Sequence, residues 1–476
     1  MIDSILEWAG RIDTILWGPW TMAFIAAVGI YLGVRSRFFQ FCGIRLIWRN
    51  TLGKIFETPE SRSSEKLTPF QATATALAST VGMGNMAGVA TALSVGGPGA
   101  IFWMWIFALL GMMTKTVEIT LAVHYREFDP DGALHGGPMY YMRRGLGWPF
   151  LAKLFSLGIL VNSLFTATLI QSHTVGRSFL KSYALNPYFT TGVMAVVTGV
   201  VIFGGIRRIG RFCETLVPLM SLLYIAGGLV IFILNFDKIP DVFTSIFTYA
   251  FAPAPAAGGF AGAAIAAALK QGMARGMLSN EAGLGTAPMV HANADTPHPF
   301  QQGLWGAFEV FFDTIVICTI TSFAILSTGV LSGGETGIEL VIAAFSAELS
   351  PGLSGTLISV SILTFCLTTQ IGFFIYFETA ILNLFGRRAI RYLKWFYLMP
   401  GVVFAGVVDV DRLWVLANIS VGVCSLPNLV AVLALSGAFF KLMQDFLSGQ
   451  NRYTTSLIDK SQEYVQSPPS TLIRRS

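Results

Sequence analysis

Charged residues are scarce in this sequence. Of its 476 residues, only 12% are Asp, Glu, Lys or Arg, whereas 54% are hydrophobic. A soluble domain carries about 25% charged residues, so a soluble fold is excluded. The hydrophobic residues form blocks of about 20, the length at which a helix spans a bilayer, and the short alternating strands of a membrane β-barrel do not occur. We therefore predict an all-α, polytopic membrane protein.

Cysteine and histidine are also few, with five of each. They are scattered, and neither a CxxC nor an HExxH motif occurs, so we expect neither disulfides nor a structural metal. The Ser/His pair, His-rich cluster or paired aspartates that an intramembrane enzyme would need are absent at suitable spacing. No motif for nucleic acid or a redox cofactor stands out. We do not expect an enzyme.

About eleven apolar segments are long enough to span a membrane, and the loops between them alternate in basic content. Loops rich in Lys and Arg, such as 35–66 and 387–394, alternate with loops that are poor in them, such as the acidic 332–350. The positive-inside rule then places the N-terminus outside and the C-terminus inside; we expect the membrane to be a bacterial inner membrane. The predicted spans are 14–34, 68–95, 98–122, 151–175, 188–206, 213–235, 241–274, 301–331, 353–385, 392–408 and 413–440.

Two of these spans contain residues that do not suit a helix in lipid. Residues 78–88 read ASTVGMGNMAG, although glycine weakens helices and asparagine is costly in lipid. Five spans later, 248–272 read TYAFAPAPAAGGFAGAAIAAALKQG, with proline and glycine in the middle. The predicted orientation makes these two spans run in opposite directions. Equivalent breaks in two five-helix halves of opposite direction indicate an inverted repeat.

A broken membrane helix exposes backbone groups that are tolerated only where they line a cavity or meet a ligand. The N–H groups that begin a half-helix attract carboxylates, and the freed carbonyls coordinate cations. The break around VGMGN (81–85) therefore predicts a site for a zwitterion and a sodium ion. The alternative is that its glycines are notches for close helix packing.

Four further blocks of sequence carry a family resemblance. They are GGPGAIFWMWIFALLG (96–111), GGPMYYM (136–142), ARGMLSNEAGLGTAP (274–288) and DTIVICTITS (313–322). In this order they resemble the sodium:alanine symporter family, also called the alanine or glycine:cation symporters. Over about 14–440 the resemblance implies a LeuT-like fold, a 5+5 inverted repeat with one extra N-terminal helix. It also implies cotransport of small neutral amino acids, chiefly alanine and glycine, with sodium.

This interpretation divides the chain into four parts. An N-terminal span and a cytoplasmic amphipathic linker occupy 1–67, although the second half of this region can equally be a plain linker. The two five-helix repeats occupy 68–235 and 236–440. A flexible cytoplasmic tail occupies 441–476.

The resemblance places substrate contacts in the first broken span. LeuT-like sodium transporters share a V-G-x-G-N pattern, which Val81, Gly82, Met83, Gly84 and Asn85 match. It implies that backbone N–H groups near Met83 and Gly84 hold the substrate carboxylate. Asn85 would offer its amide to the substrate or to an ion.

Further substrate contacts are implied in other spans. Gln171 can donate to a carboxylate and accept from an ammonium group, and the alternative for it is a hydrogen bond between helices. Gly258, Gly259 and Phe260 would supply carbonyls for the ammonium group and a wall of the side-chain pocket.

The implied sodium site has two halves. Ala78 and Val81 would contribute backbone carbonyls, and Thr368 and Thr369 would contribute hydroxyls; Thr369 would also border the substrate. Such oxygen ligands suit a hard, monovalent cation. The alternative for both threonines is a hydrogen bond to a carbonyl of their own helix.

The eighth core helix departs from the family pattern. Where T-I-L-G-W is expected, this chain has Thr369, Gln370, Ile371, Gly372 and Phe373. Phenylalanine in place of tryptophan predicts a larger side-chain pocket, which leaves strict selectivity for alanine and glycine open. We expect the polar Gln370 to face a neighbouring helix.

Several charged residues fall inside predicted spans, where isolated charges are expensive. We expect Lys115, Glu118, Glu309, Asp313 and Lys270 to pair or to face water, with Lys270 ending the second broken helix. They form either a cytoplasmic gate or a static lock on the bundle, and Asp313 is also a candidate proton carrier.

The sequence thus predicts a sodium-coupled symporter that imports alanine, glycine or a related small neutral amino acid by alternating access. Proton coupling is the alternative within transport, and an intramembrane enzyme or a channel is the alternative outside it. The expected partners are the amino acid, sodium and the lipid bilayer, without nucleic acid. The oligomeric state is open, with a monomer as the working assumption.

Overall fold

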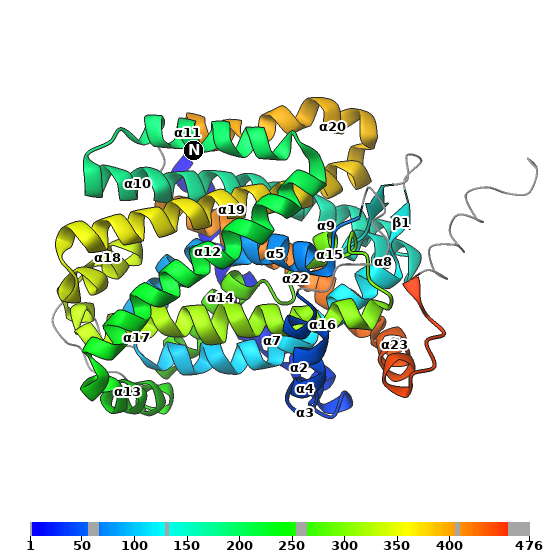
Figure 1. Ribbon diagram of the computed structural model, residues 1–476, viewed down its shortest axis with the longest axis horizontal. Helices are drawn as coiled ribbons and strands as arrows, with labels where there is room; N and C mark the ends of the chain where they lie inside the picture. Colours follow the sequence, from blue (N-terminus) through cyan, green and yellow to red (C-terminus); the bar gives the residue numbers. More distant parts are fainter. Residues whose placement is uncertain (1, 56–65, 129–132, 254–263, 405–409, 456–476) are drawn as a thin grey trace, which may run out of the picture.

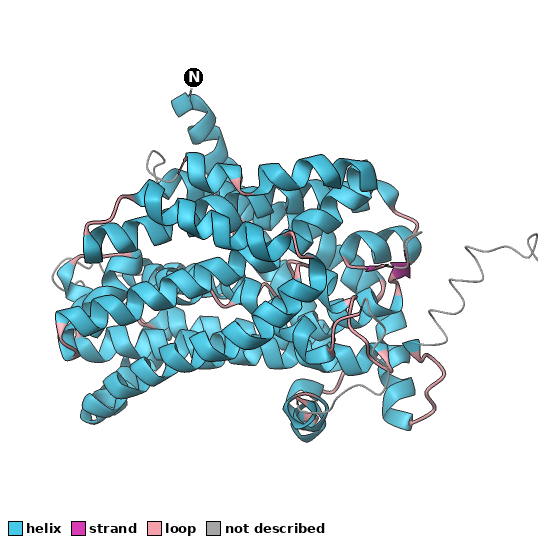
Figure 2. Ribbon diagram, turned by 45° about the horizontal axis from the view of Figure 1, so that its top comes forward, coloured by secondary structure: helices cyan, strands magenta, loops and turns pink. Residues whose placement is uncertain are grey.

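The computed structural model describes residues 2–55, 66–128, 133–253, 264–404 and 410–455. Helices dominate this part of the chain, and its one sheet is the antiparallel pair β1 (Glu127–Phe128) and β2 (Leu134–His135). Figures 1 and 2 show a bundle of long helices that run roughly along its longest axis, with the small hairpin at one end.

Within the described residues, seven helices are long and apolar enough to cross a membrane, or eight when one bent pair counts as a span. They are Trp8–Arg35, which includes the end of α1 (Ile2–Leu16) and α2 (Pro19–Arg35); the bent pair of α5 (Pro69–Thr80) with η2 (Gly84–Gly88) and α6 (Val89–Gly96); α7 (Gly99–His124); α9 (Pro149–Asn162) continued by η3 (Ser163–Ile170) and α10 (Gln171–Tyr183); α12 (Gly205–Leu234); α16 (Pro299–Val310) continued by η5 (Phe311–Cys318) and α17 (Thr319–Thr328); α19 (Pro351–Phe385); and α22 (Val410–Ala434).

The other three predicted spans are shorter or interrupted. The first is α11 (Pro187–Ile202), an apolar helix of 16 residues. The second divides into α13 (Ile239–Phe251) and α14 (Ile265–Asn280), and the breaking residues between them fall largely outside the described part. The third consists of the short helices α20 (Arg387–Leu393), η7 (Lys394–Tyr397) and α21 (Met399–Val403). The helical, polytopic prediction is confirmed, while the count of eleven and the orientation stay predictions.

Short elements cap the two ends of the bundle. Figure 1 shows α8, β1, α20 and α23 at one end and α13 and α18 at the other. The remaining short elements are α3 (Phe39–Cys42), α4 (Ile44–Asn50), η1 (Leu52–Lys54), α8 (Pro138–Arg144), η4 (Phe236–Lys238), α15 (Ala287–His291), η6 (Val330–Gly333), α18 (Gly337–Glu348) and α23 (Ser436–Ser448).

Basic residues of the loops are divided unevenly between these two ends of the bundle. Near α18, Lys181 lies 3.7 Å from Glu335, and Arg177 lies 3.8 Å from Glu339. The predicted outer loops, which are poor in basic residues, therefore lie together. The basic residues of α20 lie at the opposite end. The alternating loop charges of the sequence predict this separation of basic-poor loops from basic ones.

Helix α7 packs extensively against α14 and α16, and glycines let these two neighbours approach closely. A Cβ on Gly272 of α14 would lie 2.8 Å from the Cβ of Trp103 and would also collide with the carbonyl of Ala100. A Cβ on Gly303 of α16 would lie 2.8 Å from the carbonyl of Thr116. Small residues at such crossings are the usual means of packing membrane helices.

A larger side chain at this crossing should therefore destabilise the protein. We expect Gly272→Val to cost about 1–3 kcal/mol, the usual range for overpacking, and to lower the apparent melting temperature of the purified protein. The matched control is Gly192→Val in α11, because a Cβ on Gly192 would meet nothing within 4 Å. Equal melting temperatures for the two variants would contradict the close packing of α14 on α7.

Candidate functional site

The first broken span bends sharply at Gly82. Helix α5 starts with a capping box between Thr68 and Gln71, ends at Thr80, and is bent by 50° from the helix that follows. In a continuous helix, the Gly82 N–H would bond to the carbonyl of Ala78. It donates instead to Oδ1 of Asn85, at 2.9 Å. A side chain thus replaces the helical partner at the break.

The other end of the Asn85 amide holds a buried carboxylate. Its Nδ2 donates to Oδ1 of Asp313 at 2.7 Å and to the Asp313 carbonyl at 3.1 Å. The Ser279 hydroxyl donates to Oδ2 of the same carboxylate at 2.7 Å. Asn85 and Asp313 are both fully buried. Asp313 belongs to the π-helical segment η5. Its hydrogen bonds therefore join η5 to the first broken span and to α14.

Glycines bring two other helices against the break. A Cβ on Gly82 would lie 2.6 Å from the Thr369 hydroxyl of α19, and a Cβ on Gly84 would lie 3.2 Å from the Cα of Ser279 in α14. One turn along α19, a Cβ on Gly372 would collide with the Ser79 hydroxyl of α5. These glycines let α19 and α14 contact the break directly.

A small internal cavity of about 30 Å³ lies beside the break. The first broken span and α19 contribute polar groups to its wall, and apolar side chains such as Leu278 and Val421 complete it. The residues that line it are Ser79, Thr80, Gly82, Met83, Gly84, Asn162, Thr166, Gln171, Leu278, Glu281, Leu284, Thr369, Phe373 and Val421.

Two of these side chains carry buried polar atoms without a hydrogen-bond partner among the described residues. They are Oε1 of Gln171, an acceptor, and Nδ2 of Asn162, a donor. The orientation of Asn162 is set by its Oδ1, which accepts from Thr166 at 2.5 Å and from Ser420 at 3.2 Å. The cavity therefore presents one unfilled acceptor and one unfilled donor.

Comparison with known proteins identifies the family. A model of the "Sodium:alanine symporter family" matches residues 2–460. The chain belongs to this family. It is 36% identical over 436 residues to "Sodium/alanine symporter AgcS" of Methanococcus maripaludis, covering 90% of this chain and 94% of that protein. It is also 36% identical over 447 residues to "Probable sodium/glutamine symporter GlnT" of Bacillus subtilis, covering 94% and 91%.

A solved structure supports the fold of this family member. The "Crystal structure of MhsT in complex with L-phenylalanine" aligns with a TM-score of 0.58 at 12% sequence identity, covering 78% of this chain and 90% of that one. The LeuT-like fold predicted from the sequence is therefore confirmed. The protein is a multi-pass membrane transporter and not an enzyme.

The structure gathers most of the predicted substrate residues of the symporter around one cavity. Six of them line it: Gly82, Met83, Gly84, Gln171, Thr369 and Phe373. Val81 and Asn85 are buried next to it in the chain and do not line it. Gly258, Gly259 and Phe260 lie outside the described residues, so their predicted roles stay predictions.

The four predicted sodium ligands differ in their surroundings. Ala78 and Val81 are fully buried at the end of α5. The hydroxyls of Thr368 and Thr369 both donate to the carbonyl of Phe365, at 2.9 Å, within α19. Thr369 faces the break at Gly82, whereas the Thr368 hydroxyl also lies 3.5 Å from the sulfur of Met220. The hydrogen bond within the helix is thus present in both threonines.

Several cavity residues were not among the predicted ones. Asn162, Thr166 and Glu281 are polar side chains that line the cavity. A polar residue inside a membrane span is a functional signal in itself, so Asn162 was detectable in principle. Glu281 falls in the family block 274–288 and has a left-handed backbone (φ 56°) just after α14.

The prediction that Gln370 faces a neighbouring helix is confirmed. Its Nε2 donates to the Ser172 hydroxyl of α10 at 2.9 Å, and its Oε1 accepts from Thr198 of α11 at 3.2 Å. The Tyr397 hydroxyl donates to the Gln370 carbonyl at 2.6 Å. Gln370 therefore fixes α19 to its neighbours and points away from the cavity.

The buried charges form a network around the end of α14. The Lys115 ammonium lies 3.4 Å from Glu309 and donates to the carbonyl of Asn280 at 2.7 Å. Glu309 also contacts the ring of His291, at 2.6 Å. Separately, Glu118 accepts from the N–H of Gly283 at 3.3 Å. Pairing is confirmed for Lys115 and Glu309, whereas Glu118 and Asp313 accept hydrogen bonds from neutral groups.

Lys270 is the exception among the predicted charges. We expected it to end the second broken helix, but α14 continues to Asn280, ten residues further. At 1.5 Å per residue, Lys270 is about 15 Å along the helix from the Lys115 contact. The half-buried Lys270 lies near the start of α14, so its predicted place at the helix end was wrong.

The approach of Thr369 to Gly82 generates a stability prediction. Gly82→Ala should lower the apparent melting temperature, because the added methyl would lie 2.6 Å from the Thr369 hydroxyl. Gly82→Ala combined with Thr369→Ala should restore most of the loss, because the nearest remaining Thr369 atom, its Cβ, is 3.8 Å away. Gly88→Ala, with nothing within 4 Å, is the control in the same span. No recovery in the double variant would contradict this contact.

Proposed function

We propose that the protein is a sodium-coupled symporter that imports alanine, glycine or a related small neutral amino acid by alternating access. The observation that carries the proposal is the pair of unpartnered polar atoms in the cavity, Oε1 of Gln171 and Nδ2 of Asn162. A buried polar atom without a partner costs roughly 1–3 kcal/mol. A zwitterion offers an ammonium donor to the first atom and a carboxylate acceptor to the second.

The break in α5 offers further groups to the same ligand. Met83 and Gly84 line the cavity at the start of the second half of the span, where backbone N–H groups attract a carboxylate. We propose that these N–H groups and Asn162 share the substrate carboxylate, while Gln171 holds the ammonium group. Gly258, Gly259 and Phe260 would complete the site from the second broken helix.

The size of the cavity favours a small substrate. Its volume of about 30 Å³ corresponds to about one water molecule's share of liquid volume, so the walls must move apart to admit even alanine. Phe373, Leu278 and Leu284 supply an apolar wall for a short aliphatic side chain. Because Phe373 replaces the expected tryptophan, a side chain somewhat larger than that of alanine remains within the proposed range.

Sodium would bind where α19 meets α5. Ala78 and Val81 would contribute carbonyls, and Thr368 and Thr369 would turn their hydroxyls from Phe365 to the ion. A cation held in this way fixes α19 against the break, which preorganises the N–H groups for the carboxylate. The effect is reciprocal: each ligand must bind more tightly in the presence of the other.

The proposed cellular setting follows from the loop charges. The end that carries α20 and α23 would face the cytoplasm of a bacterium, with the N-terminus outside. Residues 68–235 and 236–440 would form the two repeats that move against each other, the segment 1–67 would flank them, and 441–476 would be a cytoplasmic tail. We take the transporting unit to be a monomer.

Uptake into proteoliposomes tests the substrate and the ion together. We expect labelled alanine to accumulate under an inward sodium gradient but not under an equal potassium gradient, with glycine, serine and glutamine as competitors. Asn85→Ala and Thr369→Ala should abolish the sodium-dependent part. Uptake that is equal in potassium would contradict sodium coupling, and competition from larger amino acids alone would contradict the small-substrate assignment.

Gln171 provides a sharper test of the cavity. Gln171→Leu should raise the KM for alanine by about tenfold or more, because a hydrogen bond to a charged group contributes roughly 1.5–3 kcal/mol. Gln444→Leu, at an exposed position of α23, is the matched control and should leave the KM unchanged. A normal KM in Gln171→Leu would remove Gln171 from the substrate site.

Proton coupling is the second candidate, because Asp313 is a buried carboxylate at the break. Asp313→Asn removes its ability to release a proton while its side chain stays a hydrogen-bond acceptor for Asn85. If Asp313 carries a proton, the variant should lose the pH dependence of alanine uptake between about pH 5 and 8. If sodium alone drives uptake, the pH dependence of the residual uptake should match that of the wild type.

A further inference from the structure

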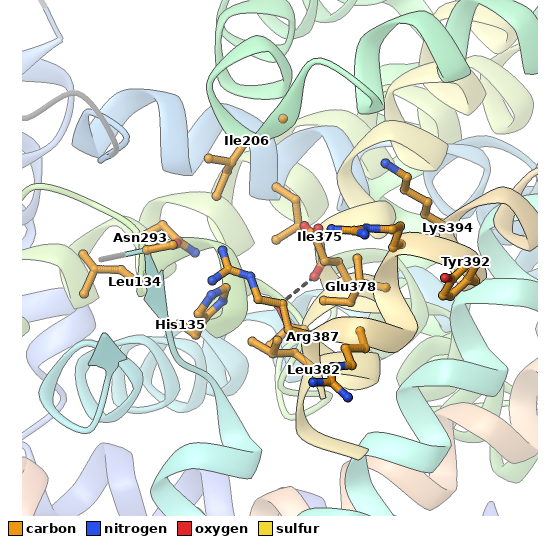
Figure 3. Close-up of a pocket in the computed structure, with 16 residues that line it drawn as sticks. Leu134, His135, Ile206, Asn293, Ile375, Glu378, Leu382, Arg387, Tyr392 and Lys394 are labelled. Atoms are coloured by element: carbon orange, nitrogen blue, oxygen red, sulfur yellow. Dashed lines mark hydrogen bonds between the residues drawn. The ribbon is translucent and has the colours of Figure 1, made fainter. Parts of the chain in front are cut away.

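A second cavity, much larger than the first, opens at the basic end of the bundle. It has a volume of about 730 Å³ and is lined by residues of the β1–β2 hairpin, α19, α20 and η7. Figure 3 shows Leu134, His135 and Asn293 across from Glu378 and Lys394, with the Arg387 side chain extending between the two sides. Its volume is within the range of about 300–1,000 Å³ that is typical of ligand sites.

The charge of this cavity is strongly positive. Arg387, Arg388, Arg391 and Lys394 all line it, and Glu378 is the carboxylate that lines it with them. Among the described residues, Arg388 and Arg391 have no hydrogen-bond or ion-pair partner. Like charges that share one cavity repel each other unless an anion lies between them. The cavity is therefore suited to an anion, and arginine is suited to phosphate in particular.

This cavity is not the floor of the substrate cavity. Thr369 lines the substrate cavity and Glu378 lines the basic cavity, and nine residues of the same helix separate them. Nine residues are about two and a half helical turns, so the two side chains lie on opposite faces of α19. The two cavities share no lining residue.

An exposed apolar surface adjoins the basic cavity. Tyr392, which lines the cavity, is 69% exposed, and Trp395 and Phe396 after it are 61% and 57% exposed. The Trp395 ring packs on Phe203 of the α11–α12 connection, with centroids 4.3 Å apart. Lys394 lies over the same Phe203 ring at 5.1 Å. Aromatic residues next to cations are typical of the membrane–water interface.

We propose that the basic cavity binds the phosphate headgroup of an anionic phospholipid, with the acyl chains on the apolar surface formed by Trp395, Phe396 and Met399. The positive-inside rule assigns this end of the bundle to the cytoplasmic face, and basic pockets at that face are suited to anionic headgroups. A free phosphate would satisfy Arg388 and Arg391 equally well. The adjoining aromatic surface favours the lipid, because only a lipid covers it.

The test measures lipids that stay bound to the whole, purified transporter. The protein is equilibrated in mixed micelles with equal amounts of phosphatidylglycerol and phosphatidylethanolamine, and native mass spectrometry then counts the bound lipids. We expect the wild type to retain phosphatidylglycerol preferentially. The double variant Arg388→Gln/Arg391→Gln should weaken that binding by about tenfold or more, since each cation near an anionic headgroup contributes about a fivefold factor.

The matched control is Arg45→Gln/Arg49→Gln in α4, which removes the same charge from two exposed positions in another basic loop. It should leave phosphatidylglycerol binding unchanged, and an equal loss in both double variants would overturn the proposal. Complete displacement of the lipid by an equal concentration of inorganic phosphate would overturn it in favour of a free phosphate, because the acyl chains would then contribute nothing to binding.

A second variant separates binding from folding. Because the loss of two arginines can disturb α20 itself, Arg388→Lys/Arg391→Lys keeps both charges at the same positions. It should retain phosphatidylglycerol to within about threefold of the wild type, since most of the attraction is electrostatic. A loss as large as that of the glutamine pair would show a structural role for the arginines and would overturn the proposal.

Discussion

The membrane interior leaves no water to satisfy a backbone group, and this constraint acts most strongly where the first core helix breaks at Gly82. The side chain of Asn85 satisfies the backbone group that the break frees: its Oδ1 accepts from the Gly82 N–H, and its Nδ2 donates to Asp313. Because Asp313 also accepts from Ser279, elements from both halves of the chain hold the break in place. A bare Gly-Met-Gly segment would not keep one conformation, since glycine loses the most freedom on folding. The cavity, the contact with α19 and the proposed ligand sites all depend on this one amide.

The cavity residues that the sequence singles out are those whose chemistry does not suit a helix in lipid. Gly82 and Gln171 are of this kind, and both line the cavity. Asn162 suits a helix in lipid just as poorly, but its spacing from Gln171 does not indicate that the two side chains share a site. Nine residues separate it from Gln171, which in a regular α-helix puts the two on opposite faces. The π-helical segment η3 (Ser163–Ile170) lies between them and changes this register, and both side chains reach the same cavity. The sequence shows which side chains are unusual, but not the π-helical turn that brings them together.

The end of α14 shows a second limit of sequence reasoning. The glycines and prolines of the broken span predict that a second half-helix follows the break, but they do not define where it stops. It stops at Asn280, whose carbonyl accepts from Lys115 of α7. A cation at a helix C-terminus stabilises the last carbonyls, and here it comes from a residue 165 positions earlier in the chain. The pairing of Lys115 with Glu309 follows from the cost of a buried charge, whereas its use as a helix cap depends on tertiary packing.

Helix α19 connects these features because it is one continuous helix of 35 residues. Thr369 faces the break, Gln370 is bonded to α10 and α11, and Glu378 faces the basic cavity. Three faces of this one helix therefore carry the proposed ion site, the hydrogen bonds to α10 and α11, and the proposed lipid site. A tilt of α19 that opens the contact at Gly82 must also move Glu378 relative to the start of α12 and the hairpin, which line the same cavity. A lipid headgroup that fixes the basic cavity would therefore bias the same motion that releases the ion, without touching the substrate.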